Sequence, residues 1–429
     1  MPFQIGSWLL LGVVLLSSEA VAKPASDAML PSLAALVTEY VATLDGQRAD
    51  ELLQQILSRD DATVAAVGSI LTEGPAYHQS APVGMQPEQE VLVGSQVFEY
   101  GLYVPEDYHS EKSYPLIICL HGAGFTGDAY LERWQIRLGE NYILACPTLM
   151  SGDWWTRTAE QLVLATIGAV SGIYHIDPDR VFLTGMSNGG IGAYLIGAHQ
   201  APRFAAIVPM ASGLDHVLMP FLENFQNSPL YIIHGKRDQV MPVELSHAIV
   251  DMLAELNYSY VYREHDRIHP VAGGHFFPRE ELADLVTWLG LQHRNPYPKK
   301  LTVVQDASHL LRFYWVRIDA TDRIASFTEA LIDRQDEAIK SRLYARIGTT
   351  IKDNTIAVGA THVRRYTLFL NDQLVDLARP ITVITNGTES FNAKVTPSAR
   401  TMLHEARVRH DQQALYPVSI TVDVPAARR

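Results

Sequence analysis

The chain has 429 residues, of which 47% are apolar and 19% are charged, and its mean hydropathy is close to zero. This composition excludes a disordered chain, a collagen-like polymer and a multi-span membrane protein, and the length favours two or three domains over one core. The net charge of −13 argues against nucleic acid and anionic membranes as partners, and two cysteines are too few for a disulfide scaffold or a structural zinc cluster.

Residues 1–22 have the pattern of an export signal peptide. Residues 5–16 form a mostly apolar run that is too short to span a bilayer, and Ala20-Val21-Ala22 is a small-x-small cleavage site. Residues 1–4 contain no Lys or Arg, which departs from the usual signal, and a buried apolar helix is the alternative. We expect a secreted or periplasmic protein without membrane insertion once the signal is removed.

Residues 23–88 are predicted to form a helical N-terminal segment. Apolar residues recur there at the i, i+3, i+4, i+7 spacing of a one-faced helix, and Asp45-Gly46 separates the first helix from the second. The positions with this pattern are Leu33, Leu36, Val37, Tyr40, Val41 and Leu44, then Leu52, Leu53, Ile56 and Leu57, and more weakly Val64, Val67 and Ile70. These short helices must dock on a larger body, and they carry no catalytic pattern.

Residues 89–295 are predicted to form an α/β domain. Two strands, at 91–93 and 97–104, are joined by a Gly94-Ser95 turn. Continuous apolar runs, typical of strands buried on both faces of a parallel sheet, follow at 116–120, 142–146, 181–184, 206–210, 230–233 and 258–262. Helical patterns lie between most of these runs, so the expected fold class is α/β with a mostly parallel, doubly wound sheet.

Residues 296–429 are predicted to form a C-terminal antiparallel β domain that resembles a sandwich and acts as an accessory. Two prolines within 295–300 indicate a stiff linker, and strand patterns follow at 310–318, 345–351, 355–358, 365–370, 381–385 and 418–424. Asn386-Gly387 is a hairpin-turn signal, because both residues tolerate positive φ. Phe313 and Trp315 share one strand face, which favours the core over a carbohydrate-binding surface.

The pentapeptide Gly185-Met186-Ser187-Asn188-Gly189 is the clearest catalytic pattern. It directly follows the apolar strand at 181–184 and precedes an apolar helical stretch at 191–198. A serine in such a strand–turn–helix elbow has its hydroxyl pushed out of the sheet, and a Cβ at either flanking glycine would clash. Ser187 is therefore the predicted nucleophile. A glycine-rich turn with an incidental serine is the alternative.

A serine nucleophile needs a histidine base that is held by a carboxylate. Asp238 follows the strand at 230–233 and His275 follows the strand at 258–262, so both are expected at the carboxyl edge of the sheet. Gly273-Gly274 allows the loop before His275 to fold back over the elbow. The rival acids are Asp215, Asp251 and Asp266, and the rival bases are His265 and His269.

The segment His121-Gly122-Ala123-Gly124 ends the buried strand at 116–120. A glycine-rich loop at this position can present backbone N–H groups to a developing oxyanion. The backbone N–H groups of Ala123 and Asn188 are the predicted oxyanion-hole donors. A turn needed only for close packing is the alternative.

Residues 114–291 resemble an α/β-hydrolase of the esterase type, similar to the group of secreted polyhydroxybutyrate depolymerases, feruloyl esterases and acetylxylan esterases. The resemblance is carried by Leu120-His121-Gly122-Ala123-Gly124, Ile176-Asp177-Pro178-Asp179-Arg180-Val181, Gly185-Met186-Ser187-Asn188-Gly189-Gly190, His234-Gly235-Lys236-Arg237-Asp238 and Gly274-His275. It implies a Ser187–His275–Asp238 triad and ester hydrolysis through an acyl-enzyme. It does not extend to the N-terminal helices or the β domain.

The expected function is that of a secreted serine carboxylesterase without a cofactor, acting on a small-molecule ester or an ester of a plant or microbial polymer. A serine peptidase of the prolyl-oligopeptidase type shares the fold and triad order and is the alternative enzyme. The chain shows no acidic motif for a peptide N-terminus. A binding protein on a hydrolase scaffold is the alternative from another class, against which the intact Ser187, Asp238 and His275 argue.

Two residue pairs have a functional and a structural interpretation. Trp154-Trp155 follows the strand at 142–146 and is predicted to bind substrate as an aromatic platform, with packing of a long loop as the alternative. Cys119 and Cys146 are expected on neighbouring strands as buried free thiols, with a disulfide as the alternative.

No metal site is expected from the histidines near the end of the α/β domain. His265, His269 and His275 are close in sequence, but Pro270 and Gly273-Gly274 break any helical ligand register.

Overall fold

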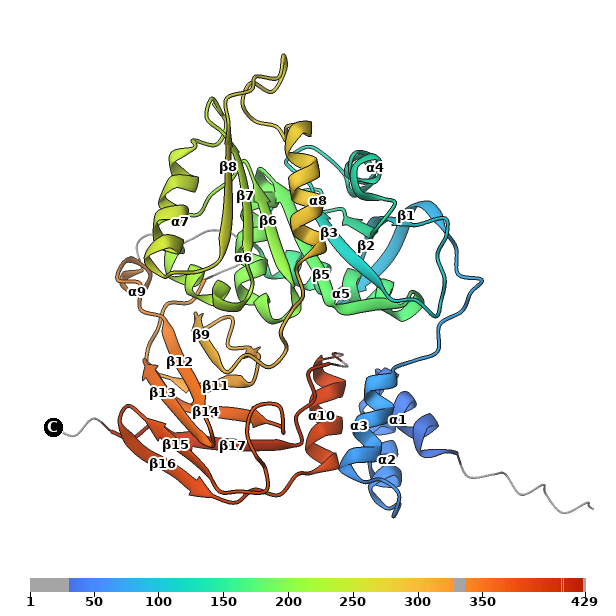
Figure 1. The fold of residues 1–429 in the computed structure, drawn as a ribbon, viewed down its shortest axis with the longest axis vertical. Helices are drawn as coiled ribbons and strands as arrows, with labels where there is room; N and C mark the ends of the chain where they lie inside the picture. Colours follow the sequence, from blue (N-terminus) through green and yellow to red (C-terminus); the bar gives the residue numbers. More distant parts are fainter. Residues whose placement is uncertain (1–30, 328–335, 410, 412, 427–429) are drawn as a thin grey trace, which may run out of the picture.

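A computed structural model describes residues 31–327, 336–409, 411 and 413–426. The predicted export signal, residues 1–22, lies outside these described residues. In the described part of the chain, no helix is both long enough and apolar enough to cross a bilayer. Figure 1 shows an upper body built on a large sheet and a lower body of smaller sheets and helices.

The upper body is built on an eight-stranded sheet with the order β1-β2-β4-β3-β5-β6-β7-β8. Its strands are β1 (Gly84–Val93), β2 (Gln96–Val104), β3 (Tyr114–Leu120), β4 (Ile143–Pro147), β5 (Ile176–Met186), β6 (Ala206–Met210), β7 (Leu230–Gly235) and β8 (Tyr260–His265). Neighbours from β4 to β8 pair in parallel, whereas β2 is antiparallel to both β1 and β4. Every residue of β3, β4, β6 and β7 is buried, which explains their continuous apolar sequences.

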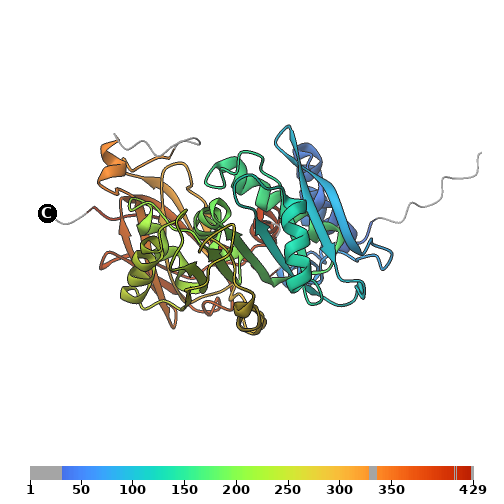
Figure 2. The same ribbon diagram turned by 90° about the horizontal axis from the view of Figure 1, so that it is seen from above.

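Helices cover both faces of this sheet (Figure 2). One buried cluster joins the sheet to α5 (Arg157–Ile173), α6 (Asn188–His199) and α7 (Glu244–Glu255), and the second joins it to α4 (Gly127–Leu138) and α8 (Leu282–Gly290). Short 3-10 turns are η1 (Ala201–Arg203), η2 (Met219–Asn227) and η3 (Arg279–Glu281). The α/β fold class expected from the sequence is confirmed.

The N-terminal helices pack on the last helix of the chain and not on the large sheet. They are α1 (Leu33–Ala42), α2 (Gly46–Leu57) and α3 (Val64–Glu73), and they share a buried cluster with α10 (Ala399–Arg409). Asp45 caps α2, as the break at Asp45-Gly46 predicted. The predicted boundary after residue 88 falls inside β1, because that strand begins at Gly84.

The lower body is a two-sheet β domain around a common core. One sheet contains β9 (Lys300–Gln305), β12 (Ala345–Lys352), β13 (Thr355–Thr361), β15 (Ile381–Thr385) and β16 (Thr388–Ala393), and the other contains β10 (Arg312–Phe313), β11 (Val316–Thr321), β14 (Val363–Leu370) and β17 (Val418–Asp423). A short helix, α9 (Glu337–Lys340), precedes β12. All pairs are antiparallel except β13 with β15.

Two details of the β domain bear on the sequence predictions. The expected single strand at 310–318 is a tight hairpin, because the chain turns at Tyr314, which has φ = 50°, between β10 and β11. Phe313 and Trp315 are nevertheless both buried, so the prediction of a core position is confirmed. Asn386 and Gly387 form the predicted two-residue turn, with φ values of 49° and 80°.

The two bodies share buried side chains. Val304 and Tyr344 of the β domain belong to the cluster on the α5–α6 face of the large sheet. The Asn224 side chain accepts a hydrogen bond from Val304 N at 2.7 Å and donates to Val304 O at 3.0 Å. The segment at 295–300 is pinned to the β domain, since Trp315 Nε1 donates to Pro298 O at 2.7 Å. The connection is therefore a packed junction and not a free tether.

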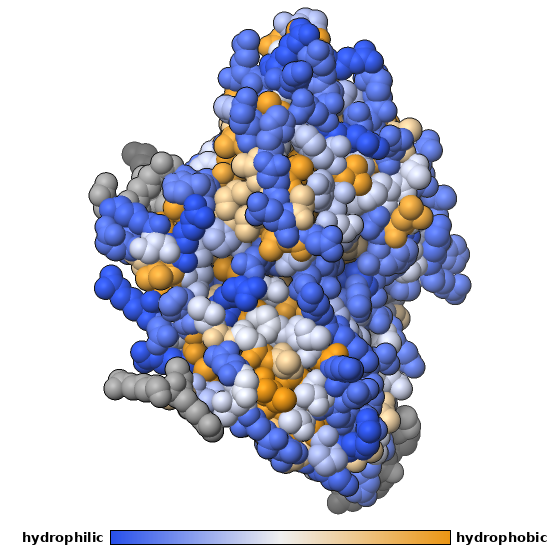
Figure 3. All heavy atoms as spheres, turned by 60° about the vertical axis from the view of Figure 1, so that its left-hand side comes forward, coloured by the Kyte–Doolittle hydropathy of each residue, from blue (hydrophilic) through white to orange (hydrophobic). Residues whose placement is uncertain are grey.

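The surface over α7 and the neighbouring part of the β domain is mainly hydrophilic, with apolar residues in small separate groups (Figure 3). Inside the large sheet, Cys119 and Cys146 lie on the adjacent strands β3 and β4. Both thiols are fully buried and unbridged.

Candidate active site

Ser187 occupies the turn between β5 and α6. Its backbone is in the left-handed region, with φ = 58° and ψ = −125°, and its N–H donates to Met210 O at 3.0 Å. A Cβ at Gly185 would lie 2.0 Å from Gly189 O, and a Cβ at Gly189 would lie 2.2 Å from Leu120 O. Only glycine fits at these two positions, so the elbow geometry predicted from the pentapeptide is present.

His275 and Asp238 come together at the carboxyl edge of the sheet. His275 Nδ1 and Asp238 Oδ2 are 2.7 Å apart, and the Asp238 side chain is fully buried. Ser187 and His275 line one pocket, although no hydrogen bond joins these two described side chains in this structure. Such contacts commonly tighten only when a substrate is bound.

Gly274 allows this approach of the two loops. A Cβ at Gly274 would lie 2.4 Å from the Arg237 carbonyl carbon and 2.5 Å from Asp238 N, so the loop that carries His275 can press against the Asp238 loop only with glycine there. The rival base His269 lines the same pocket as Ser187, but two other rival groups are placed elsewhere. Asp266 is exposed and pairs with Arg237, and the His265 ring contacts Phe276 O at 3.2 Å.

The carboxylate of Asp238 is held by donors on several sides. Val240 N and Met241 N donate to Oδ1 at 2.8 and 2.9 Å, and His234 Nε2 lies 3.4 Å from Oδ2. Burial alone would raise the pKa of Asp238, but the hydrogen bonds from His234, His275 and the two backbone N–H groups hold it far below its usual value. The lowered pKa favours the ionised form of Asp238, which can orient the His275 ring.

His234 is a site residue that the sequence analysis did not single out. Its side chain is fully buried, and it contacts Ser246 Oγ at 2.7 Å and Met241 O at 2.8 Å in addition to Asp238. It thereby fixes the loop that presents the Asp238 carboxylate. The only signal for it was its place in the segment His234-Gly235-Lys236-Arg237-Asp238.

Both predicted oxyanion-hole residues lie beside Ser187. Ala123 lines the pocket, and Asn188 is the first residue of α6. Neither backbone N–H donates to an acceptor among the described residues, and the Asn188 side chain contacts Gly152 O at 3.3 Å. Two free N–H groups next to the nucleophile are what a developing oxyanion requires.

Trp154 does not form a substrate platform. Its side chain has no exposed surface, and its Nε1 donates to His121 O at 2.8 Å. His121 Nε2 in turn accepts from Leu149 N at 3.0 Å, and burial lowers the pKa of His121. Trp154 therefore locks the loop that carries Ala123, which corrects the predicted role. Trp155 is 37% exposed and lies outside the residues that line the pocket, so its role stays a prediction.

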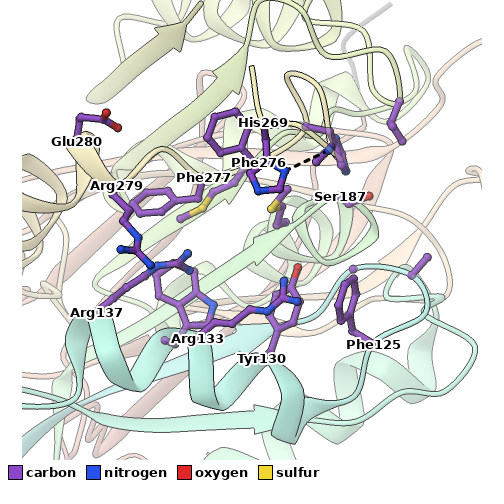
Figure 4. Close-up of a pocket in the computed structure, with 18 residues that line it drawn as sticks. Phe125, Tyr130, Arg133, Arg137, Ser187, His269, Phe276, Phe277, Arg279 and Glu280 are labelled. Carbon is purple, nitrogen blue, oxygen red and sulfur yellow. Dashed lines mark hydrogen bonds between the residues drawn. The ribbon is translucent and has the colours of Figure 1, made fainter. Parts of the chain in front are cut away.

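The pocket beside Ser187 has a volume of about 740 Å³ and a largely aromatic wall. Helix α4 contributes Tyr130, Arg133, Trp134 and Arg137, whose i, i+3, i+4, i+7 spacing puts them on one helix face. Phe125, Phe276, Phe277 and Arg279 complete this wall, which Figure 4 shows opposite Ser187.

One group among the described residues brings three metal-ligating side chains together, namely Glu160, His199 and His309. None of them lines the pocket. The two imidazole rings are stacked, with centres 4.1 Å apart and planes at 22°, so the lone pairs of the two rings lie in nearly parallel, separate planes and do not both point at one ion. His199 Nδ1 instead bonds to Glu160 Oε2 at 3.0 Å. The arrangement is a hydrogen-bonded contact and not a coordination sphere.

The curated proteins similar to this chain include feruloyl esterases and, at 24% identity over 187 residues, an uncharacterized peptidase of Bacillus subtilis. The chain is 33% identical over 205 residues to the probable feruloyl esterase C of Aspergillus terreus, an alignment that covers 44% of this chain and 72% of that protein. It is 29% identical over 157 residues to the probable feruloyl esterase C of Aspergillus flavus, covering 34% of this chain and 57% of the relative. No family model matches the chain. Among solved structures, a thermostable esterase is 25% identical and has a TM-score of 0.42, covering 49% of this chain and 63% of that chain.

The large sheet, the serine elbow after β5 and these relatives together define the upper body as a serine ester hydrolase with the α/β-hydrolase fold. The alignments cover less than half of the chain. The chain belongs to the feruloyl esterase C family.

Proposed function

We propose that this chain is an exported serine carboxylesterase in which Ser187, His275 and Asp238 form a catalytic triad. The observation that supports this proposal most is the 2.7 Å contact between His275 Nδ1 and Asp238 Oδ2, at the edge of the pocket that Ser187 also lines. The Asp238 anion holds the proton on Nδ1 of the ring, which leaves Nε2 free to act as the base.

The reaction then proceeds in two halves. Nε2 of His275 takes the proton of Ser187 Oγ while the oxygen attacks the ester carbonyl carbon, and the oxyanion is stabilised by Ala123 N–H and Asn188 N–H. The tetrahedral intermediate collapses, and the alcohol leaves with the proton from His275. Water, activated by the same ring, hydrolyses the acyl-enzyme and restores Ser187.

The proposed substrates are esters of a plant or microbial polymer, with feruloyl, acetyl or polyester linkages. The names of the relatives support an aromatic acyl group, and the aromatic wall formed by Phe125, Trp134, Phe276 and Phe277 can pack against one. The β domain has no residue among those that line the pocket, so its proposed role is accessory.

A direct test compares wild type with Ser187→Ala. Wild type should be labelled by a fluorophosphonate probe at Ser187 and should hydrolyse 4-nitrophenyl acetate and methyl ferulate, whereas the variant should do neither and should unfold at the same temperature. Labelling that survives the substitution would identify another nucleophile. Faster cleavage of an aminoacyl 4-nitroanilide than of either ester would favour the peptidase alternative.

A further inference from the structure

The pocket beside Ser187 contains three arginine side chains without a carboxylate partner among the described residues. Arg133 and Arg137 come from α4 and Arg279 begins η3, yet none of them forms an ion pair within the described chain. Glu280, which is the one acidic lining residue, pairs with Arg267 at 3.2 Å. Three unpaired cations in one pocket are unusual in a chain whose net charge is −13.

Aromatic rings hold two of these guanidinium groups. The Arg133 guanidinium lies 4.6 Å from the centre of the Phe125 ring, and that of Arg137 lies 5.1 Å from the centre of the Phe277 ring. Figure 4 shows Arg137 and Arg279 together at one end of the pocket and the Arg133 side chain extending toward Tyr130 and Phe125. Stacking on a ring face restricts a guanidinium group and leaves its N–H donors free for a ligand.

The electrostatics of the pocket favour an anion. Burial lowers the pKa of Arg137, and the charges of Arg279 and Arg133 lower it further. Arg137 is therefore partly desolvated and repelled by the charges of Arg133 and Arg279. A bound negative charge would relieve this repulsion and would find several donors.

We infer that the pocket takes esters that carry a free carboxylate, which Arg133, Arg137 and Arg279 bind while the body of the ester lies against the aromatic wall. The guanidinium fork matches a carboxylate with two parallel hydrogen bonds. This inference rests on the proposed esterase function and adds a substrate class to it. If the arginines only kept the pocket hydrated, charged and neutral esters of equal size would be hydrolysed equally well.

The test uses two pairs of esters that differ by a carboxylate in place of a methyl group. Methyl hydrogen terephthalate and methyl 4-methylbenzoate differ in the acyl part, and 4-acetoxybenzoate and 4-methylphenyl acetate differ in the alcohol part. After correction for the uncatalysed rate of each ester, wild type should have a kcat/KM about tenfold higher for the charged member of at least one pair. The preference should arise mainly in KM and should shrink as salt is added.

Variants connect the preference to the arginines. Arg137→Gln, and the double change Arg133→Gln with Arg279→Gln, should each lower kcat/KM for the preferred charged ester about tenfold more than for its neutral partner. Arg157→Gln removes an exposed arginine on α5 outside the pocket and should keep the preference. Equal rates within both pairs, or a preference that survives in the pocket variants, would overturn the inference. If none of the four esters is hydrolysed, the esterase proposal itself fails.

Discussion

The pocket beside Ser187 and the junction between the two bodies both gather charged side chains, but they treat them in opposite ways. At the junction, Arg294 is buried and pairs with Asp411 at 2.6 Å and with Asp179 at 2.8 Å. In the pocket, Arg133 and Arg137 lie against aromatic rings and form no ion pair with a described carboxylate. The charge of Arg294 at the junction is balanced by carboxylates of the same chain. The charges of Arg133 and Arg137 in the pocket have no such partner among the described residues and are available to a ligand.

This difference predicts that substitutions at the junction change the stability of the protein, whereas substitutions beside Ser187 change the rate of the reaction. A buried ion pair that loses one partner leaves an uncompensated charge, so changes at the junction should act on folding. If Ser187, His275 and Asp238 form the proposed triad, changes there remove groups that act on the substrate, so they should lower the rate and leave the fold in place. Three experiments test this separation, beginning with the largest effect.

Removal of the β domain should prevent the upper body from folding. A chain cut after residue 295 loses α10, on which α1 to α3 pack, and loses Tyr344, whose ring centre lies 4.9 Å from that of Phe221. We expect residues 23–295 alone to be insoluble, and solubility should return when residues 296–429 are expressed with them. A soluble fragment that keeps the full activity on 4-nitrophenyl acetate would show that the junction is dispensable.

Asp238→Asn should lower kcat by about 10³- to 10⁴-fold while the protein stays folded. The amide would donate to His275 Nδ1, which forces the ring proton onto Nε2 and removes the base. Oδ1 would still accept from Val240 N and Met241 N, so the loop should hold. Asp266→Asn is the matched control, because Asp266 is exposed and pairs with Arg237 nearby. A loss of less than tenfold for Asp238→Asn would mean that another carboxylate orients His275.

Much of the catalytic edge could be predicted from the sequence because its geometry depends on local patterns. Ser187 lies in an elbow that only glycines at 185 and 189 permit, and β7, the strand before Asp238, is an apolar run that is buried throughout. The strand before His275 was expected at 258–262, whereas β8 spans Tyr260–His265 and is only partly buried. Each of these signals lies within a few residues of the group that it positions. The strand order was not predicted, and the pairing of His275 with Asp238 was expected only because both residues follow strands that end at the same edge of the sheet.

The remaining features depend on contacts between residues far apart in the chain. Nothing near Trp154 in the sequence says that its ring faces the His121 carbonyl, which is why its role was predicted incorrectly. The docking of α1 to α3 on α10 joins the two ends of the described chain. The apolar spacing within a helix shows which face is buried but not which element covers it. The basic and aromatic face of α4 was not predicted either, although the i, i+3, i+4, i+7 spacing from Tyr130 to Arg137 was a local signal for it.

The smallest effect concerns the pH dependence of stability at the junction. Glu160, His199 and His309 meet there, with Asp306 bonded to His309 Nδ1 at 3.0 Å. Burial disfavours the charged forms of His199, Glu160 and Asp306, but the hydrogen bonds and opposite charges around these three groups have the larger effect. They raise the pKa of His199 above 6.5, lower that of Glu160 below 4.5 and lower that of Asp306 to about 2.

The signs of these shifts define a pH window. A raised histidine pKa contributes stability that is fully present below pH 6.5 and is lost as the pH rises through the folded-state value. A lowered carboxyl pKa contributes stability that is present above the ordinary value, 4.5 for Glu160, and is lost as the pH falls through the folded-state value. The cluster should therefore stabilise the protein most between about pH 4.5 and 6.5.

Glu160→Gln should lower the unfolding free energy there by about 1 kcal/mol and by less at pH 8. His247→Gln is the control, because His247 forms an exposed pair with Glu264 and should change stability little at any pH. The unfolding temperatures of wild type and Glu160→Gln should be measured from pH 4 to pH 8. If their difference stayed constant over this range, the cluster would not be charged in the folded protein.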